Sequence, residues 1–462
     1  MEKEVRLKTP CITLGQLLKI ENIVSSGGQA KYFLEEHADE IFVNGEHENR
    51  RGKKLYPGDE VVVADQGKFV IKPENDMRLS NLKLKNLRNY HETKLEFSPN
   101  INVLIGENAQ GKTNLLESIY VLAMTKSHRT TNDRELIEFS EKSAFLEGIV
   151  EKKTGNLRLS LSLSKKGKTA RVNSLETPRL SQYIGKLNVI LFSPEDLSLV
   201  KGSPAVRRRF IDMEFGQIDA VYLYELTRYR TILRDRNVYL KQLQTKQSTD
   251  RVYLEVLTEQ LAKSGAKIIL KRLEFLKELE NYAKILHADI TQQKENLTFK
   301  YKCTASIDDL EMNQDAIEIR LKETFETIVD KEIFQGTTLI GPHRDDVSFK
   351  VNGRNVQTYG SQGQQRTTAL AVKLAEIDLM RAKTGEYPVL LLDDVLSELD
   401  GERQTHLLKA IQDKVQTFLT TPGLNDIARQ LIKQPRLFRI NAGKIEVKPE
   451  TIVFYPKKEN ES

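Results

Sequence analysis

The sequence predicts an α/β protein with a parallel sheet and an inserted helical lobe, preceded by a small α+β unit. An apolar run, INVLI at 101–105, leads into a glycine loop and then into an apolar helical face. A second apolar run, VLLL at 389–392, ends in two carboxylates and is expected to be a buried parallel strand. Between them, residues 222–268 repeat apolar side chains at steps of three and four, which is typical of paired helices.

Length and composition limit the classes of protein. At 462 residues the chain is too long for one compact domain, so two or three domains are expected. Its 71 basic and 65 acidic residues leave a net charge of +6, which indicates a polyanionic partner only weakly. Cys11 and Cys303 are too few for a disulfide framework or a multi-cysteine zinc site. Because no run of about 18 apolar residues occurs, we expect a cytoplasmic protein.

The N-terminal stretch alternates between helix-like and strand-like segments. TLGQLLKIENI and SSGGQAKYFLEEH predict two helices, and EIFVNG and EVVV predict short strands separated by Asn-Gly and Pro-Gly-Asp turns. After Val63, the segment ADQGKFVIKPEND is polar at its ends and contains Pro73, which indicates a linker before a fresh start at Met77. The first unit is expected to occupy residues 1–72.

The helical series predicts two antiparallel helices of about 25 to 35 residues each, or roughly 40 to 50 Å. Arg236 interrupts the apolar series of the first helix. The two helices are expected to pack against each other as a subdomain at 206–304. The flanking parts, 77–205 and 305–462, would then form one α/β lobe. The apolar positions are Tyr222, Leu226, Tyr229, Leu233, Leu240 and Leu243, then Leu254, Leu257, Leu261 and Ile268.

GENAQGKT after the first strand predicts a phosphate-binding loop. Glycines allow successive backbone N–H groups to turn toward an anion, which also faces the positive end of the following helix. Lys112 would contact the β- and γ-phosphates, and the Thr113 hydroxyl would bind Mg²⁺. The expected ATP-binding residues are Gly106, Glu107, Asn108, Ala109, Gln110, Gly111, Lys112, Thr113 and Asn114.

Two acids follow the second strand in PVLLLDDVLSELD. Asp393 is expected to hold Mg²⁺, and Asp394 to orient or deprotonate the attacking water. Upstream, YGSQGQQRTTALAVKLAEI places a polar glycine loop before an amphipathic helix, which predicts a second anion-binding surface at Ser361, Gln362, Gly363 and Gln364.

This order of motifs resembles the signature, Walker B and D-loop series of ABC-type ATPases. Within them the chain resembles the RecF family over nearly all of residues 77–455, including SHRTTNDRELI at 127–137, VILFSPEDLSLVKGSPAVRRRFID at 189–212 and LIGPHRDDVSF at 339–349. The resemblance implies catalytic roles for Lys112 and Asp394, a D-loop with Ser397 and Asp400, and a signature that acts on nucleotide held by a second protomer. It also implies ATP-dependent dimerisation, DNA binding at gaps or single-strand/double-strand junctions on the nucleoid, and RecA loading with RecO and RecR.

The sequence departs from transporter ATPases at two places. The signature reads SQGQQ, where transporters carry a serine and two glycines. The γ-phosphate sensor, a histidine in transporters, falls in FLTTPG, so Thr420 or Thr421 would take that role. The Q-loop glutamine has no clear position.

Arginines are the candidate DNA contacts, because phosphates are bound by cations without regard to base sequence. The expected contacts are Arg129, Arg207, Arg208 and Arg344. Acids interleave in these stretches, so a solvated surface is the alternative. His343 with Asp345 and Asp346 could also suggest a metal or nuclease site, but one histidine and two acids are too few, and a structural role is favoured.

The first unit resembles the small S-four-like RNA-binding domain, especially its YaaA type. The resemblance implies that Lys19, Gln29 and Lys31 face a nucleic-acid backbone, with positive charge added by Arg50, Arg51, Lys53 and Lys54. A docking domain with solubilising charges is the alternative. Three other functions remain open: an RNA- or ribosome-linked ATPase, a transporter ATPase subunit and a nuclease. Little sequence after Asp400 is available for a further catalytic domain.

Overall fold

The structure is a computed structural model that describes residues 2–7, 11–56, 58–73, 77–107, 111–307, 313–412, 414–424, 426–432, 435–441 and 443–448. They fall into two compact units. The first comprises Met1–Arg78 with Glu151–Gly155, and the second comprises Leu79–Val150 with Asn156–Ser462. Each unit has a hydrophobic core of its own.

The first unit is a five-stranded sheet, in the order β1-β7-β6-β3-β4, with two helices. The predicted helices are present, and each begins at a side-chain cap, Thr13 for α1 and Ser26 for α2. The elements are β1 (Glu2–Leu7), β2 (Ile12–Thr13), α1 (Leu14–Ile20), α2 (Gly27–Glu36), β3 (Ile41–Val43), β4 (Glu46–His47), β5 (Lys54–Leu55), β6 (Glu60–Val63) and β7 (Gly67–Pro73).

The prediction of a linker after Val63 is wrong. Residues 67–73 form β7, which pairs antiparallel with β6 and parallel with β1. Phe69 and Ile71, on either side of the partly exposed Val70, are buried in the core, as are Val5 and Leu7 of β1. The burial alternates as in a half-buried strand, but Val70 makes residues 69–71 a continuous apolar run, so the residue types alone do not show the alternation.

The second unit contains a six-stranded sheet in the order β15-β19-β20-β10-β21-β22. The first five strands are parallel, and β22 is antiparallel to β21. Strand β20 therefore lies between the two strands that the sequence predicted to bear the phosphate loop and the acid pair. The strands are β10 (Ile101–Ile105), β15 (Val189–Phe192), β19 (Val389–Asp393), β20 (Thr417–Thr421), β21 (Arg436–Asn441) and β22 (Lys444–Lys448).

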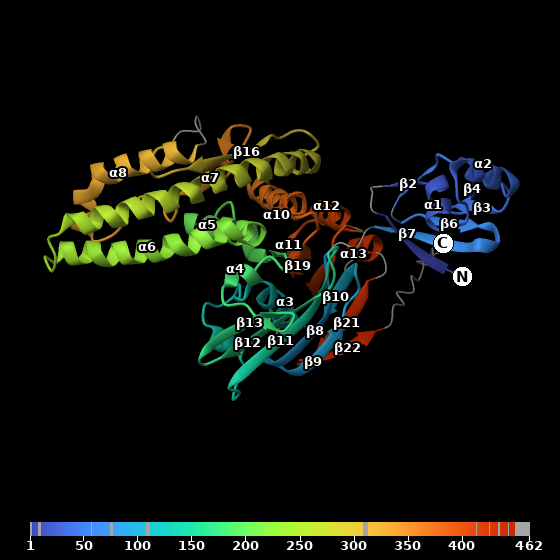
Figure 1. Cartoon of the computed structure of the whole chain (residues 1–462), viewed down its shortest axis with the longest axis horizontal. Helices are drawn as coiled ribbons and strands as arrows, with labels where there is room; N and C mark the ends of the chain where they lie inside the picture. The colour runs from blue at the N-terminus through green and yellow to red at the C-terminus, as the bar shows by residue number, and fades with distance from the viewer. Residues whose placement is uncertain are drawn as a thin grey trace, which may run out of the picture. The chain divides into compact units, whose positions relative to one another are not determined.

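A second, antiparallel sheet in the order β14-β13-β12-β11-β8-β9 faces the first (Figure 1). Helix α3 (Lys112–Met124) packs against β15, β19 and β20 of the parallel sheet and against β12 of the antiparallel one. It is buried along most of its length, which fits the continuous apolar run at 119–124 in its second half. The strands are β8 (Arg78–Leu87), β9 (Tyr90–Glu96), β11 (Ser143–Glu151), β12 (Leu157–Ser164), β13 (Gly167–Val172) and β14 (Leu175–Glu176).

The helical lobe has three long helices side by side, α6, α7 and α8 (Figure 1). Helices α6 (Ala220–Gln244) and α7 (Arg251–Ile290) are the predicted pair, with 25 and 40 residues. The third, α8 (Gln314–Gln335), lies beyond the expected boundary at residue 304 and packs on both. A sheet in the order β16-β17-β18 adjoins them, with β16 (Leu297–Lys302), β17 (Asp346–Val351) and β18 (Arg354–Asn355).

Shorter helices connect these parts. They are α4 (Leu180–Tyr183), α5 (Pro204–Ile218), α9 (Val356–Tyr359), α11 (Val395–Glu398), α12 (Gly401–Ile411) and α13 (Asp426–Leu431), together with the long α10 (Gln362–Thr384) and the 3-10 turns η1 (Ala64–Gln66), η2 (Asp133–Leu136) and η3 (Pro194–Ser198). Within the described residues, no helix is long and apolar enough to cross a membrane.

The third helix explains why a charged residue interrupts the apolar series of α6. Arg236 is fully buried, and its guanidinium donates to Glu332 of α8 at 2.6 Å and to the hydroxyls of Thr258 and Thr338. It also stacks over the Phe325 ring, 4.7 Å from the centroid. The pair holds α8 to α6, and either partner alone would be an uncompensated buried charge.

We expect Glu332→Ala to destabilise the helical lobe by about 3–5 kcal/mol, the usual result of removing one partner of a buried ion pair. Hydrogen exchange in α6 and α8 would measure the loss. The matched control is Arg251→Ala, which breaks the exposed pair to Asp330 between α7 and α8 and should cost less than about 1 kcal/mol. Equal effects of the two variants would contradict this account.

Candidate functional site

The phosphate loop joins β10 to α3, and space at its first residue admits only glycine. A Cβ on Gly106 would lie 2.4 Å from the carbonyl oxygen of Ile440 in β21. At the other end, Gly111 adopts φ +113°, which residues with a side chain rarely take. Asn108, Ala109 and Gln110, which the sequence placed in this loop, lie outside the described residues.

Lys112 bends back across the loop. Its ammonium donates to the carbonyl oxygen of Gly106 at 2.5 Å, and the residue is 6% exposed. Burial lowers the pKa of Lys112, while the carboxylates of Asp394 and Asp393 act in the opposite direction. The cation is therefore held at the mouth of the loop, on the side of the acid pair, where a phosphate could replace the carbonyl oxygen. Glu107 is exposed to solvent.

The acid pair lies beside the start of α3. The Thr113 hydroxyl donates to Asp393 Oδ1 at 3.1 Å, although 280 positions separate these residues in the chain. They meet because β10 and β19 are parallel strands of one sheet, whose carboxyl ends share an edge. A hydroxyl and a carboxylate oxygen suit Mg²⁺, which takes few protein ligands and completes its shell with phosphate and water. Within the described residues, no cluster of three or more His, Cys, Asp or Glu could hold a metal by itself.

The sequence left undecided whether Thr420 or Thr421 would sense the γ-phosphate, and the structure separates the two. The Thr420 hydroxyl donates to Asp393 Oδ1 at 2.7 Å and accepts the backbone N–H of Asp394 at 2.9 Å. Strand pairing places it there, because Thr420 of β20 lies opposite Asp393 of β19. The next residue, Thr421, bonds instead to Gly423 of its own turn. Thr420 therefore touches both acids, whereas Thr421 has no described contact with either.

Asp394 has an unusual backbone conformation and a side-chain oxygen without a partner. It adopts φ 53° and ψ 22°, a left-handed conformation that is uncommon for residues with a side chain. Its Oδ1 atom is buried and has no hydrogen-bond partner among the described groups. Such a buried acceptor is costly unless something else, such as a water molecule, occupies it.

The signature residues lie at the start of α10. Ser361 caps the helix: its hydroxyl oxygen accepts the N–H of Gln364 at 3.1 Å, while the Gln364 side chain accepts the N–H of Ser361 at 3.0 Å. Gln364 also donates to Glu295 at 2.7 Å. The side chain of Gln364 is therefore engaged within the protomer, whereas the hydroxyl hydrogen of Ser361 remains available to an acceptor. No described contact joins these residues to Lys112 or Asp393.

Arg403 connects the D-loop to the signature, a link that the sequence did not reveal. Its guanidinium pairs with Asp400 and donates to the Gly363 carbonyl oxygen at 3.1 Å and to the Thr367 hydroxyl at 3.0 Å. Hydrogen bonds from Arg403 lower the pKa of Asp400, which caps α12. The other D-loop residue, Ser397, donates to the carbonyl oxygen of Asp394 at 2.7 Å. The loop thus spans from the acid pair to the start of α10.

The segment at 127–137 packs on the outer side of α3. Glu117 of α3 is 1% exposed and accepts both ends of the Arg88 guanidinium at 2.9 Å, together with the Ser127 hydroxyl. Burial would raise the pKa of Glu117, but these hydrogen bonds outweigh it and the pKa is lowered. Arg129 continues the network, donating to Asn114 at 2.9 Å. The segment is thereby fixed to the helix that begins at the phosphate loop.

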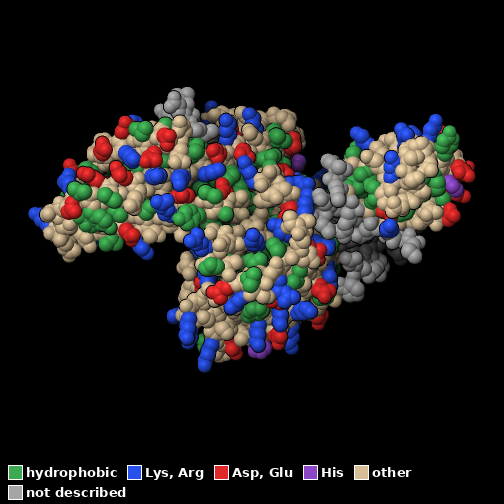
Figure 2. All heavy atoms as spheres, in the orientation of Figure 1, with side chains coloured by type: hydrophobic (Ala, Val, Ile, Leu, Met, Phe, Trp, Pro, Cys, Tyr) green, Lys and Arg blue, Asp and Glu red, His purple; other side chains and the backbone are tan. Residues whose placement is uncertain are grey.

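The candidate DNA contacts differ in exposure. Arg207 is 2% exposed, and its guanidinium is taken up by Asp346 and by backbone carbonyl oxygens. It is a structural residue here, and its expected role as a DNA contact is not supported. Arg129, Arg208 and Arg344 keep partial or full exposure. On the face seen in Figure 2, basic and acidic side chains are interspersed over the helical lobe. That face of the lobe therefore has no extended patch of positive charge.

His343, Asp345 and Asp346 have structural contacts. His343 bonds to the Tyr229 hydroxyl at 2.8 Å, and burial lowers its pKa to about 4, so it is neutral at physiological pH. Asp345 is fully buried and accepts from Tyr301 and Thr304. These partners agree with the structural role favoured above.

In the first unit, part of the expected nucleic-acid surface is engaged internally. Gln29 is exposed, as expected, but its side-chain oxygen accepts from the N–H and the hydroxyl of Ser25, which stabilises the start of α2. Arg50 forms a close pair with Glu48, which lowers the pKa of that carboxyl to about 2. Lys19 and Arg51 lie together near Gly27 at the start of the same helix.

Comparisons with known proteins agree with these features. Residues 5–72 match the family model of the S4 domain, and residues 78–426 match that of the RecF/RecN/SMC N-terminal domain. The chain is 66% identical over 373 residues to the DNA replication and repair protein RecF of Ligilactobacillus salivarius, covering 80% of this chain and 97% of that protein. It is 57% identical to RecF of Enterococcus faecalis, with 80% and 99% covered.

A solved structure, that of the recombination mediator protein RecF with ATP in the RecFOR pathway, matches with a TM-score of 0.75 and 32% identity, over 81% of this chain and 98% of that one. About four-fifths of the chain therefore aligns with nearly the whole length of these relatives. The remaining fifth corresponds in size to the first unit. The chain belongs to the RecF family of DNA replication and repair ATPases, in the RecF/RecN/SMC class, and carries an S4 domain before the ATPase unit.

Proposed function

We propose that two copies of this chain close around ATP and Mg²⁺, and that the closed dimer binds DNA at gaps or strand junctions. The observation that supports the proposal is the separation, within one protomer, of two surfaces that are candidates for phosphate binding. One is the loop from Gly106 to Thr113 beside the acid pair. The other is the start of α10, which contacts Glu295 and Arg403 and no described residue of the first surface. A second copy would bring them together.

The residues at the first surface support ATP hydrolysis. Lys112 would exchange the Gly106 carbonyl oxygen for phosphate oxygens, and Thr113 with Asp393 would hold Mg²⁺. Bound Mg²⁺ would neutralise charge on the phosphates. Asp394, with its unpartnered buried oxygen, would accept a hydrogen bond from the attacking water and align it. Ser361 of the other protomer would donate its free hydroxyl hydrogen to the γ-phosphate.

The DNA and protein partners of the dimer are proposed from the family resemblance. By family resemblance, the dimer would act with RecR and RecO to promote RecA loading, in the cytoplasm and on the nucleoid. ATP-dependent binding to gapped and intact duplexes, compared across a salt series, would test the DNA part. The slope of the binding constant against salt concentration, on logarithmic scales, would give the number of phosphate contacts. Equal, ATP-independent binding to both duplexes would contradict it.

For the S4 domain we propose contact with a nucleic-acid backbone through Lys19 and Arg51, which cluster at the start of α2. Competition between gapped DNA and folded RNA, with and without ATP, would separate a DNA role from an RNA role for the whole chain. Preference for folded RNA would favour the RNA-linked alternative.

Asp394→Asn should slow ATP hydrolysis by two to four powers of ten, about the usual contribution of a general base, while ATP stays bound. The dimer should then persist, because only hydrolysis is prevented. Single-turnover hydrolysis and nucleotide binding, measured in parallel, would check both parts. Hydrolysis at the normal rate would remove Asp394 from its assigned role.

Thr420→Val and Thr421→Val form a matched pair that tests which threonine serves the acid pair. Removing the Thr420 hydroxyl frees Asp393 and the N–H of Asp394, so turnover should fall roughly 10- to 100-fold, as for other residues that orient metal ligands. Thr421→Val should change turnover little, since its hydroxyl bonds within its own turn. The reverse order of effects would assign the role to Thr421.

Ser361→Arg should leave nucleotide binding by the monomer intact and block dimerisation, because a long cation at the helix cap would obstruct the partner's nucleotide. Sedimentation with ATP and Mg²⁺ would show a monomer. Gln247→Arg adds the same charge at the exposed turn between α6 and α7 and should dimerise normally. A Ser361→Arg variant that dimerises as wild type would exclude the signature from the interface.

A further inference from the structure

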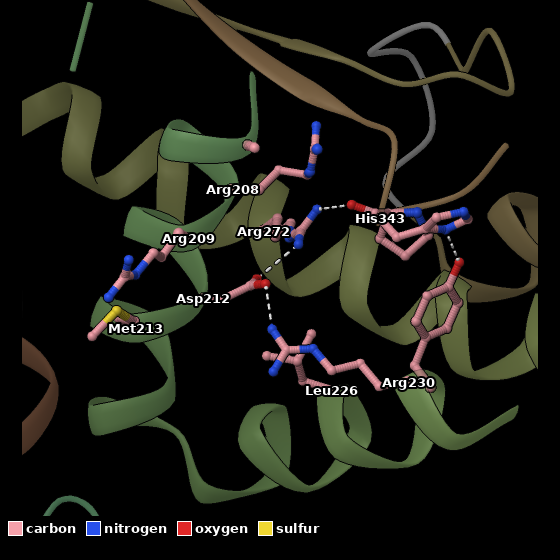
Figure 3. Close-up of a pocket in the computed structure, with 11 residues that line it drawn as sticks. Arg208, Arg209, Asp212, Met213, Leu226, Arg230, Arg272 and His343 are labelled. Carbon is pink, nitrogen blue, oxygen red and sulfur yellow. Dashed lines mark hydrogen bonds and ion pairs between the residues drawn. The ribbon is translucent and has the colours of Figure 1, made fainter. Parts of the chain in front are cut away.

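A cleft of the second unit is lined by α5, α6 and the segment that follows α3. It consists of two adjoining hollows of about 270 and 760 Å³, which share Arg209, Asp212, Met213, Leu226 and Arg230. Figure 3 shows the smaller one: Arg272 and Arg230 converge on Asp212, and Arg208 borders the hollow from α5. His343, which also lines it, bonds to the Tyr229 hydroxyl at 2.8 Å. The larger one extends past Lys126 and Thr131 to Lys168 of β13 and Leu180 of α4.

Cations in this cleft outnumber acids. Its lining contains the basic residues Lys126, Lys168, Arg179, Arg208, Arg209, Arg230 and Arg272, against Asp133 and Asp212. Asp133 pairs with Lys168, and Asp212 serves both Arg230 and Arg272. Among the described residues, no carboxylate lies within ion-pair distance of the other four. An excess of cations facing one cavity is a binding surface for an anion.

The arginines at the centre keep most of their donors free. A guanidinium has five N–H donors. Arg208 gives one to the Asp345 carbonyl oxygen at 2.9 Å, Arg209 gives one to the His128 carbonyl oxygen at 3.3 Å, and Arg230 gives one to Asp212 at 3.2 Å. Arg272 differs, because Tyr222, Tyr301, Pro342 and Asp212 occupy it. Arg272 therefore shapes the cleft, and the other three could bind phosphate oxygens.

The cations also repel one another. Burial lowers the pKa of Lys126, and the charges of Arg230, Lys168 and Arg209 lower it further, opposed by Asp133. A bound anion would relieve this repulsion. His343 is neutral at physiological pH and neither adds to it nor reduces it.

The cleft wall is apolar between these cations. Met124, Leu180, Ile184, Leu223 and Tyr224 line the larger hollow, and the side chains of Tyr224 and Leu180 are 48% and 37% exposed. Contact with a DNA duplex backbone needs cations alone, whereas an unpaired base needs an apolar or aromatic surface to stack on. A mixed wall of this kind, in a cavity of small-molecule size, suits unpaired nucleotides and excludes a duplex.

We propose that this cleft binds an unpaired segment of a DNA strand, with phosphates against Arg208, Arg209 and Arg230 and a base against Tyr224. The proposal rests on the DNA function proposed above and assigns the single-stranded part of a gapped substrate to a site within each protomer. A free nucleotide presents the same chemistry, so the test must distinguish the two sources.

Binding of the full-length chain, with ATP and Mg²⁺, would be measured on a fluorescent gapped duplex and on an intact duplex of equal length. Tyr224→Leu and Arg209→Gln should each weaken binding to gapped DNA roughly tenfold, the scale of one lost base stack or phosphate contact, with little change on the intact duplex. Tyr224→Phe keeps the ring and should bind as wild type. The charge control is Arg234→Gln, one helical turn beyond Arg230 on α6 and outside the cleft, which should also bind normally.

Three results would overturn the proposal. Unchanged binding by Tyr224→Leu and Arg209→Gln would show that the cleft does not bind DNA. Equal losses on gapped and intact duplexes would make it part of a general backbone surface. Displacement of the gapped probe by millimolar thymidine monophosphate, but not by an equal charge of inorganic phosphate, would make it a free-nucleotide site. Failure of the wild-type chain to bind either duplex would instead contradict the proposed DNA function itself.

Discussion

The structure of the candidate ATPase site depends on the hydrogen bonds that two threonine hydroxyls donate to the carboxylate of Asp393. Thr113 donates from the start of α3 and Thr420 from β20, so a single oxygen atom joins the phosphate loop, the acid pair and the strand between them. A buried carboxylate is costly without such donors. The strand order β19-β20-β10 makes the arrangement possible, because it brings Thr113 to the same edge of the sheet as Asp393, 280 positions later, and Thr420.

From this edge, contacts lead to the surface that would meet a second copy. Ser397 bonds to the backbone of Asp394, and Arg403 joins Asp400 to Gly363 at the start of α10. Gln364 then reaches Glu295, which lies between the helical lobe's α7 and β16. These contacts form a continuous path from the acid pair to the helical lobe.

The residues that the sequence predicted best are those whose role is local. A glycine loop between an apolar strand and a helix correctly placed Lys112 and Thr113 at the start of α3, and an apolar strand ending in acids placed Asp393 at the end of β19; their roles toward ATP and Mg²⁺ stay predictions. The sequence could not show the roles of residues whose interaction partners lie far away in the chain. In the sequence Arg207 resembles a DNA contact, but it is buried and pairs with Asp346, 139 residues later. Arg236 interrupts an apolar helical series, but it pairs with Glu332 of α8. Strand β7 was not predicted, because Pro73 is uncommon inside strands and Val70, between Phe69 and Ile71, hides the alternation of polar and apolar residues.

The central claim is that nucleotide lies between two copies of the chain, and inter-subunit distance tests it most directly. Chains labelled at Glu402→Cys, an exposed site beside the signature, would be mixed with chains labelled at Glu107→Cys in the phosphate loop, after replacement of Cys11 and Cys303. With ATP and Mg²⁺, electron spin resonance should detect a short distance between labels on different chains that is absent with ADP. No inter-chain distance under any nucleotide condition would contradict the account.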